Sequence, residues 1–159
     1  MDLKKIAIDK LKDRGVSIED ITEIVFNLQK KYMPDITMEQ CEEAIICVLD
    51  KREVLNTILT GIAIDEGVEK NQFDSHMHKI ILEDQGLYGI DEILALSIVN
   101  IYGSIALTNF GFLDQSKPGI IGKVDELGKG DSICNTFLDD IISAIAAAAM
   151  SRLAHNKNC

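Results

Sequence analysis

The chain has 159 residues, a formal net charge of −10 at pH 7 and a pI of about 4.7. This length suits one domain with one hydrophobic core. The acidic balance argues against nucleic-acid binding, which relies on a basic face, and against unaided binding to an anionic membrane. It is compatible with carboxylates that bind divalent cations.

The predicted elements are helices almost throughout. Apolar residues recur at helical spacing over 2–15, 17–31, 37–50, 52–70 and 75–84. Gly15 and Pro34 end the first two helices, and Thr37 with Gln40 forms a capping box for the third. Alternating strand patterns are missing. We therefore predict an all-α fold, a single-domain bundle of about six to eight helices. It consists of an N-terminal helical extension over 1–50 and a core over 52–155.

An uncharged segment follows over residues 93–113, and it is long enough to span a bilayer. Ser97, Asn100, Ser104 and Thr108 recur in it at steps of three and four, which places four polar groups on one helical stripe. A lone spanning helix would face lipid on all sides. The stripe therefore favours a helix, or a helix pair, buried in the bundle, and no stable membrane span is expected.

The rest of the chain is predicted as a loop and a final helix. Residues 119–131 contain four glycines and are typical of a loop. The last helix begins near Thr136, with Asn135 or Thr136 as its N-cap, and ends by about His155. Its alanine-rich run over 144–149 predicts close packing against a neighbouring helix. The alternative is a subunit interface in a homo-oligomer.

The four cysteines favour a reducing cytoplasm. Cys41, Cys47, Cys134 and Cys159 have no CxxC spacing, so neither a disulfide framework nor a zinc ribbon is expected. The first residues are charged and lack the apolar core of a signal peptide. We expect a cytoplasmic protein, with a peripheral position at the inner membrane face as an alternative.

Three vicinal acidic pairs are the candidate metal ligands. They are embedded in Ile, Leu, Ala and Gly: Asp65 with Glu66, Asp91 with Glu92, and Asp139 with Asp140. Each pair alone is explained by capping of a helix dipole. Buried carboxylates, however, need protons, basic partners or metal. Neighbours on a helix lie about 100° apart, so carboxylates from several helices must converge. We expect Mg²⁺, with Mn²⁺ or Ca²⁺ as substitutes.

The stretch "FLDQSKPG" supplies a basic residue beside a further carboxylate. Asp114 and Lys117 are three residues apart at the end of a helix that Pro118 terminates. One interpretation is an ion pair at a helix end. In the other, Lys117 binds a substrate phosphate and Asp114 serves as a base, a nucleophile or a metal ligand.

The order of these motifs resembles the phosphatidylglycerophosphatase A family. The elements "GIDEILALS", "GFLDQSKPGIIGKVDE" and "FLDDIISAIAAA" carry the resemblance, which covers about residues 61–153. The resemblance implies Mg²⁺-dependent removal of phosphate from phosphatidylglycerophosphate. The residues to which it points are Asp91, Glu92, Asp114, Lys117, Asp139 and Asp140. Asp65 and Glu66 have no counterpart, so their assignment rests on the pair argument.

The chain also departs from that family. A glycine-rich element near the start of typical members is replaced by the charged region of about 50 residues. The helices that correspond to the transmembrane helices of membrane-bound members are shorter and contain polar residues. This resembles a soluble branch, whose phosphate-ester substrate is a phospholipid or a related compound. Two alternatives remain: an all-α nucleotide pyrophosphohydrolase using Glu66 and Glu69, and a non-enzymatic helical oligomerisation module.

Overall fold

The computed structural model describes residues 1–155, which form nine helices and no strand. The helices are α1 (Leu3–Asp13), α2 (Ile18–Gln29), α3 (Met38–Val48), α4 (Arg52–Glu69), α5 (Ser75–Leu82), α6 (Ile90–Val99), α7 (Ser104–Ser116), α8 (Ile120–Leu127) and α9 (Leu138–Ala154). The all-α prediction is confirmed, with one helix more than the upper end of the predicted range.

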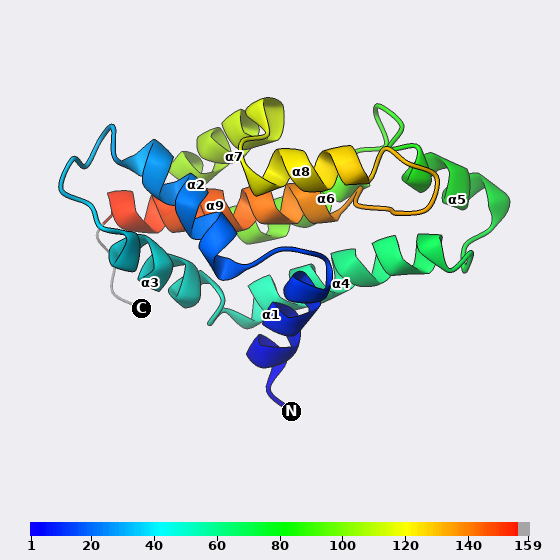
Figure 1. Cartoon of the computed structure of the whole chain (residues 1–159), viewed down its shortest axis with the longest axis horizontal. Coiled ribbons are helices and arrows are strands. Elements are labelled where there is room, and N and C mark those ends of the chain that lie inside the picture. The colour runs from blue at the N-terminus through cyan, green and yellow to red at the C-terminus, as the bar shows by residue number, and fades with distance from the viewer. Residues whose placement is uncertain (156–159) are drawn as a thin grey trace.

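The last helix, α9, is the central element of the fold (Figure 1). Every residue from Leu138 to Arg152 is buried, and α2, α3, α4, α6, α7 and α8 pack around it. The alanine-rich run is fully buried within the chain, so the predicted close packing is confirmed. Because other helices of the same chain cover this run, it offers no surface to a second copy.

Close packing of α4 on α9 depends on a glycine. A Cβ atom at Gly61 would lie 2.2 Å from Ile141 Cδ1 and 3.3 Å from Phe137 Cβ, well inside contact distance. Glycine therefore lets the backbone of α4 approach the first turns of α9. Asp65, one turn after Gly61, is thereby placed against the start of α9 and is fully buried.

The uncharged segment forms two helices, α6 and α7, separated by Asn100–Gly103. Gly103 has φ +87°, a backbone conformation that interrupts a helix. The four stripe residues Ser97, Asn100, Ser104 and Thr108 are exposed, so the prediction of a buried polar stripe is wrong. Among the described residues, no helix combines the length and apolar character needed to cross a bilayer.

Helix α8 lies where a loop was predicted. Gly119 precedes this helix with φ +56°, and Ile121 and Val124 then bury one side of a short amphipathic turn. The glycines of 119–131 therefore flank or accompany a helix. Helix α8 carries Asp125, which faces Lys117.

The N-terminal helices share the core of the rest of the chain. Leu11, Ile21 and Ile45 of α1, α2 and α3 belong to the same buried cluster as α4 and α9. The capping box predicted at Thr37 is present. Cys41 and Cys134 are buried and free, as expected for reduced cysteines. Cys159 lies outside the described residues.

Candidate active site

The first turn of α9 carries two buried carboxylates. Asp139 and Asp140 are each 3% exposed. The N-cap of α9 is Phe137, which has no capping side-chain hydrogen bond, so the predicted caps Asn135 and Thr136 are wrong by one or two residues. Asp139 Oδ2 accepts a hydrogen bond from Lys117 Nζ at 2.8 Å. Asp139 Oδ1 is buried and has no hydrogen-bond partner among the described residues.

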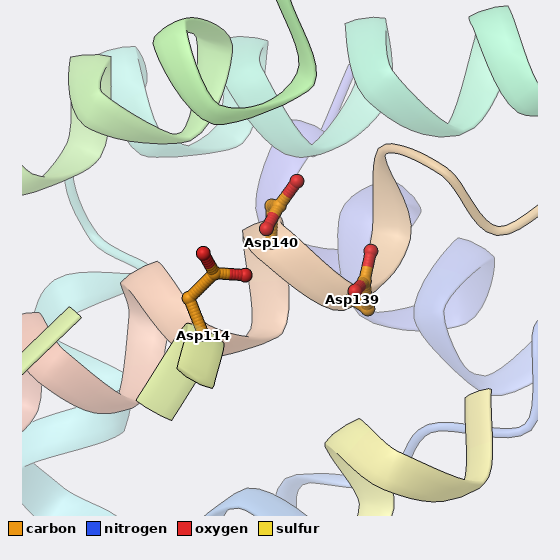
Figure 2. A group of neighbouring side chains, drawn as sticks. All are labelled: Asp114, Asp139 and Asp140. Carbon is orange, nitrogen blue, oxygen red and sulfur yellow. The ribbon is translucent and has the colours of Figure 1, made fainter. Parts of the chain in front are cut away.

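Carboxylates from α6 and α7 converge on this turn. One oxygen from each of Asp114, Asp139 and Asp140 lies within 4.8 Å of the other two. Figure 2 shows the Asp114 side chain on α7 turned towards Asp140 on α9, with Asp139 beside it. Asp91 of α6 and Asp114 both lie close enough to Asp140 to raise its pKa. Carboxylates this close repel one another unless protons or a cation lie between them.

The cluster lies at a cavity of about 330 Å³ formed by α6, α7, α9 and the turn before α6. Six acidic side chains and one basic side chain line it: Asp84, Asp91, Glu92, Asp114, Asp139, Asp140 and Lys117. Lys117 Nζ lies 2.8 Å from Asp139, 3.4 Å from Asp114 and 3.9 Å from Asp125. One ammonium group therefore faces a large excess of carboxylates.

Backbone strain concentrates at this cavity. Lys117 adopts the left-handed conformation with φ +45° and ψ +56°. Of the four non-glycine residues with positive φ in the described chain, three line the cavity: Asp84, Leu87 and Lys117. Such residues cost about 1–3 kcal/mol each and cluster at functional sites. Gly122 supports the strained turn, since a Cβ there would lie 2.5 Å from the carbonyl oxygen of Lys117.

Burial and mutual repulsion hold protons on the carboxylates. Burial raises the pKa of Asp139 to about 7, although the hydrogen bond from Lys117 lowers it. Burial and the charge of Asp139 raise the pKa of Asp140 well above its ordinary value. Burial works against the charge of Lys117, but the hydrogen bond and the charge of Asp139 raise its pKa overall. Lys117 is therefore cationic at pH 7, while the acidic cluster shares protons.

The pair Asp65 and Glu66 lies apart from this cavity, which neither residue lines. The Asp65 carboxylate accepts backbone hydrogen bonds from Phe137 at 3.1 Å and Leu138 at 3.0 Å, and so caps α9 from outside. Glu66 forms ion pairs with Lys10 at 2.9 Å and Lys70 at 3.7 Å. The contacts of this pair are those of structural residues.

Two site residues were missed in the sequence. Asp84 lines the cavity, and Asp125 of α8 faces Lys117. Each belongs to a vicinal acidic pair, Glu83 with Asp84 and Asp125 with Glu126. The same rule that selected the other pairs, applied evenly along the chain, would have found both.

The residues present fit a hard divalent cation. The donors are carboxylate oxygens from α6, α7 and α9, the ligand type that Mg²⁺ and Mn²⁺ prefer. Asp139 Oδ1 is buried without a partner, although a buried polar atom normally has one. Six acidic side chains beside one lysine also leave an excess of negative charge in the cavity, which a divalent cation would neutralise.

Fold and site together define a class of protein: an all-α domain in which side chains of facing helices build an acidic centre in the bundle core. The chain belongs to the phosphatidylglycerophosphatase A family, whose model matches residues 18–155. The match begins at Ile18, the first residue of α2, so it includes most of the region predicted as an N-terminal extension. The family resemblance seen in the motifs is confirmed.

Relatives occur in bacteria and archaea. The chain is 51% identical over 146 residues to the uncharacterized protein YutG of Bacillus subtilis, which covers 92% of this chain and 87% of YutG. It is 32% identical over 120 residues to MJ1330 of Methanocaldococcus jannaschii, covering 75% and 87% of the two chains. The crystal structure of the low temperature requirement C protein from Listeria monocytogenes superimposes with a TM-score of 0.94 at 51% identity, covering 98% and 97%.

Proposed function

We propose that this protein is a divalent-cation-dependent phosphomonoesterase that acts on phosphatidylglycerophosphate or a related phosphate ester. The family is that of phosphatidylglycerophosphatase A. One observation carries the proposal: three carboxylates from two helices meet within 4.8 Å, and a buried oxygen of Asp139 lacks a partner. In this proposal Asp91, Asp114, Asp139 and Asp140 hold the cation, and Glu92 and Asp84 line its approach.

A bound divalent cation neutralises phosphate oxygens and acts as a Lewis acid during hydrolysis. The chain's own residues provide the remaining functions. Lys117 is cationic and held between three carboxylates, so it can donate to a phosphate oxygen as negative charge develops there. Its strained backbone and the contact with Gly122 fix its position. Asp114, one-third exposed at the cavity, is the carboxylate placed to act as a base or nucleophile.

A lipid substrate is supported by the surface around the cavity. Leu87 lines the cavity and is fully exposed, and Ile90 and Ile93 continue the exposed apolar surface along α6. On α7, Leu107 and Phe112 are each 53% exposed, and residues 93–113 carry no charge. An acyl chain whose phosphate entered the cavity could pack against the exposed apolar side chains of Leu87, Ile90 and Ile93.

The alternative as a nucleotide pyrophosphohydrolase has less support. Glu66 and Glu69, the residues that it requires, form ion pairs with Lys10 and Arg14 and do not line the cavity. No described contact brings them to the carboxylates of α9.

The test compares substrates with the same preparation of protein. We expect Mg²⁺-dependent release of inorganic phosphate from phosphatidylglycerophosphate in mixed micelles, with slower release from water-soluble glycerol phosphate. Nucleoside triphosphates should yield no pyrophosphate. If phosphate release from every monoester persisted unchanged in excess EDTA, the cation-dependent proposal would be wrong. Equal rates with lipid and soluble esters would contradict its lipid part alone.

A further inference from the structure

Residues 134–138, which lead into α9 and begin it, are held by side chains from elsewhere in the chain. Asp65 accepts the backbone N–H groups of Phe137 and Leu138, and Glu69 Oε1 accepts the N–H of Cys134 at 2.9 Å. Both acceptors belong to the last turns of α4. Since Phe137 provides no cap of its own, the direction in which α9 starts depends on these contacts.

Arg14, just after α1, ties this segment to α4. Its guanidinium forms a two-pronged ion pair with Glu69, at 3.0 Å and 2.7 Å. The same group donates to the carbonyl oxygen of Cys134 and, at 2.7 Å, to Asn135 Oδ1. The Arg14 side chain is only 11% exposed. Lysine cannot replace this set of contacts, because it lacks the planar fork of five donors.

Asn135 extends these contacts to two of the helices that bear acidic site residues, α8 and α9. Its Nδ2 donates to the carbonyl oxygen of Val124 in α8 at 2.9 Å, next to Asp125. The backbone carbonyl oxygen of Asn135 accepts a hydrogen bond from the backbone N–H of Asp139 at 3.3 Å. Arg14 is therefore linked through Asn135 to α8 and to α9, the helices whose Asp125 and Asp139 both pair with Lys117. It also lies outside residues 18–155, to which the family model extends.

We infer that Arg14 is a positioning residue for the acidic cavity: by holding Cys134 and Asn135 against Glu69, it sets the start of α9 and thereby the placement of Asp139 and Asp140. This inference rests on the proposed function for its consequence in cation binding. It gives α1, which precedes the family match, a role in the site. Arg14 touches neither the cavity nor any reacting group.

The experiment compares Arg14→Lys and Arg14→Ala with Lys10→Ala. The control is matched, because Lys10 also joins α1 to α4, through Glu66, but among the described residues it forms no hydrogen bond or ion pair with residues 134–138. Mn²⁺ binding is titrated by electron paramagnetic resonance, and amide hydrogen exchange is followed in a peptide covering 134–140. We expect both Arg14 variants to bind Mn²⁺ roughly tenfold more weakly than wild type, the lower end of the loss seen for outer-shell partners. Exchange over 134–140 should be faster, and Lys10→Ala should show neither change.

Several outcomes would overturn the inference. Exchange in Arg14→Lys equal to that in Lys10→Ala would show that Arg14 does not order the start of α9. Faster exchange with wild-type Mn²⁺ affinity would reduce Arg14 to a merely structural role. If Arg14→Ala fails to fold by circular dichroism, Arg14→Lys alone decides. A wild-type protein that bound no Mn²⁺ would instead contradict the proposed function, and exchange would then decide whether Arg14 orders α9.

Discussion

Two acidic pairs that look alike in the sequence have opposite surroundings in the structure. Asp65 and Asp139 are both buried, and each is followed by another acidic residue. Asp65 meets backbone N–H donors of residues 137 and 138. Asp139 meets one ammonium group and several other carboxylates, and one of its oxygens has no partner. A buried carboxylate surrounded by donors stabilises the fold, whereas one surrounded by carboxylates is suited to binding a cation.

The largest effect is expected from neutralising the α9 pair. Asp139→Asn or Asp140→Asn should lower phosphate release by about 10³-fold, because a lost cation forfeits several kcal/mol of transition-state stabilisation. Release of phosphate from lipid micelles at saturating Mg²⁺ is the measurement. The control is Glu126→Gln, a carboxylate that is 78% exposed next to Asp125. If both α9 variants kept wild-type rates, Asp139 and Asp140 would not bind a catalytic cation, and the proposed difference from Asp65 would be wrong.

The next largest effect is expected at Lys117. Lys117→Gln should reduce kcat by about 10²-fold, the typical cost of removing one donor to a developing negative charge. The control Lys129→Gln removes another lysine that pairs with Asp125 but is 63% exposed. We expect Lys129→Gln to change kcat less than about twofold, since exposed ion pairs contribute little. If KM rose and kcat did not change, Lys117 would contribute to substrate binding only.

Asp65 should respond through stability. Asp65→Ala leaves the backbone N–H groups of Phe137 and Leu138 without acceptors. The free energy of unfolding should therefore fall by about 2–3 kcal/mol. Glu66→Ala breaks only the ion pairs with partly exposed Lys10 and exposed Lys70 and should cost below about 1 kcal/mol. Asp65→Asn keeps an acceptor oxygen and should lie between them. Urea unfolding of the three variants checks this order, and a Glu66 variant costing as much as Asp65→Ala would contradict it.

The smallest effect concerns pH and metal removal. The pKa of Asp139 is raised in the folded protein to about 7, so the folded state binds more protons than the unfolded state between pH 4 and 7. In EDTA, this group therefore makes the melting temperature fall as pH rises through that range. Saturating Mg²⁺ should raise the melting temperature by about 5–10 °C at pH 8 and less at pH 5. Thermal scans with and without EDTA test this, and a Mg²⁺ effect that grew towards low pH would contradict it.

The predicted part of the site and the missed part differ for a physical reason. Six residues were selected because charges stand out in apolar helices, and the structure brings all six to one cavity: Asp91, Glu92, Asp114, Lys117, Asp139 and Asp140. Asp84 lies in a turn and Asp125 on an amphipathic helix, where a carboxylate normally faces solvent. Asp125 faces Lys117 because α8 folds back after the turn at Lys117, whereas Asp84 reaches the cavity from a segment distant in the sequence.

The sequence by itself determined where most helices begin and end, because apolar periodicity, caps and prolines act within a few residues. It also determined that the chain carries more carboxylates than its few nearby basic residues can pair. Only the tertiary structure decided which carboxylates share a cavity and which are capped by backbone donors. The reason is that a carboxylate's role depends on the groups within about 4–6 Å. These groups come from different helices, with α4, α6, α7 and α8 packing around α9.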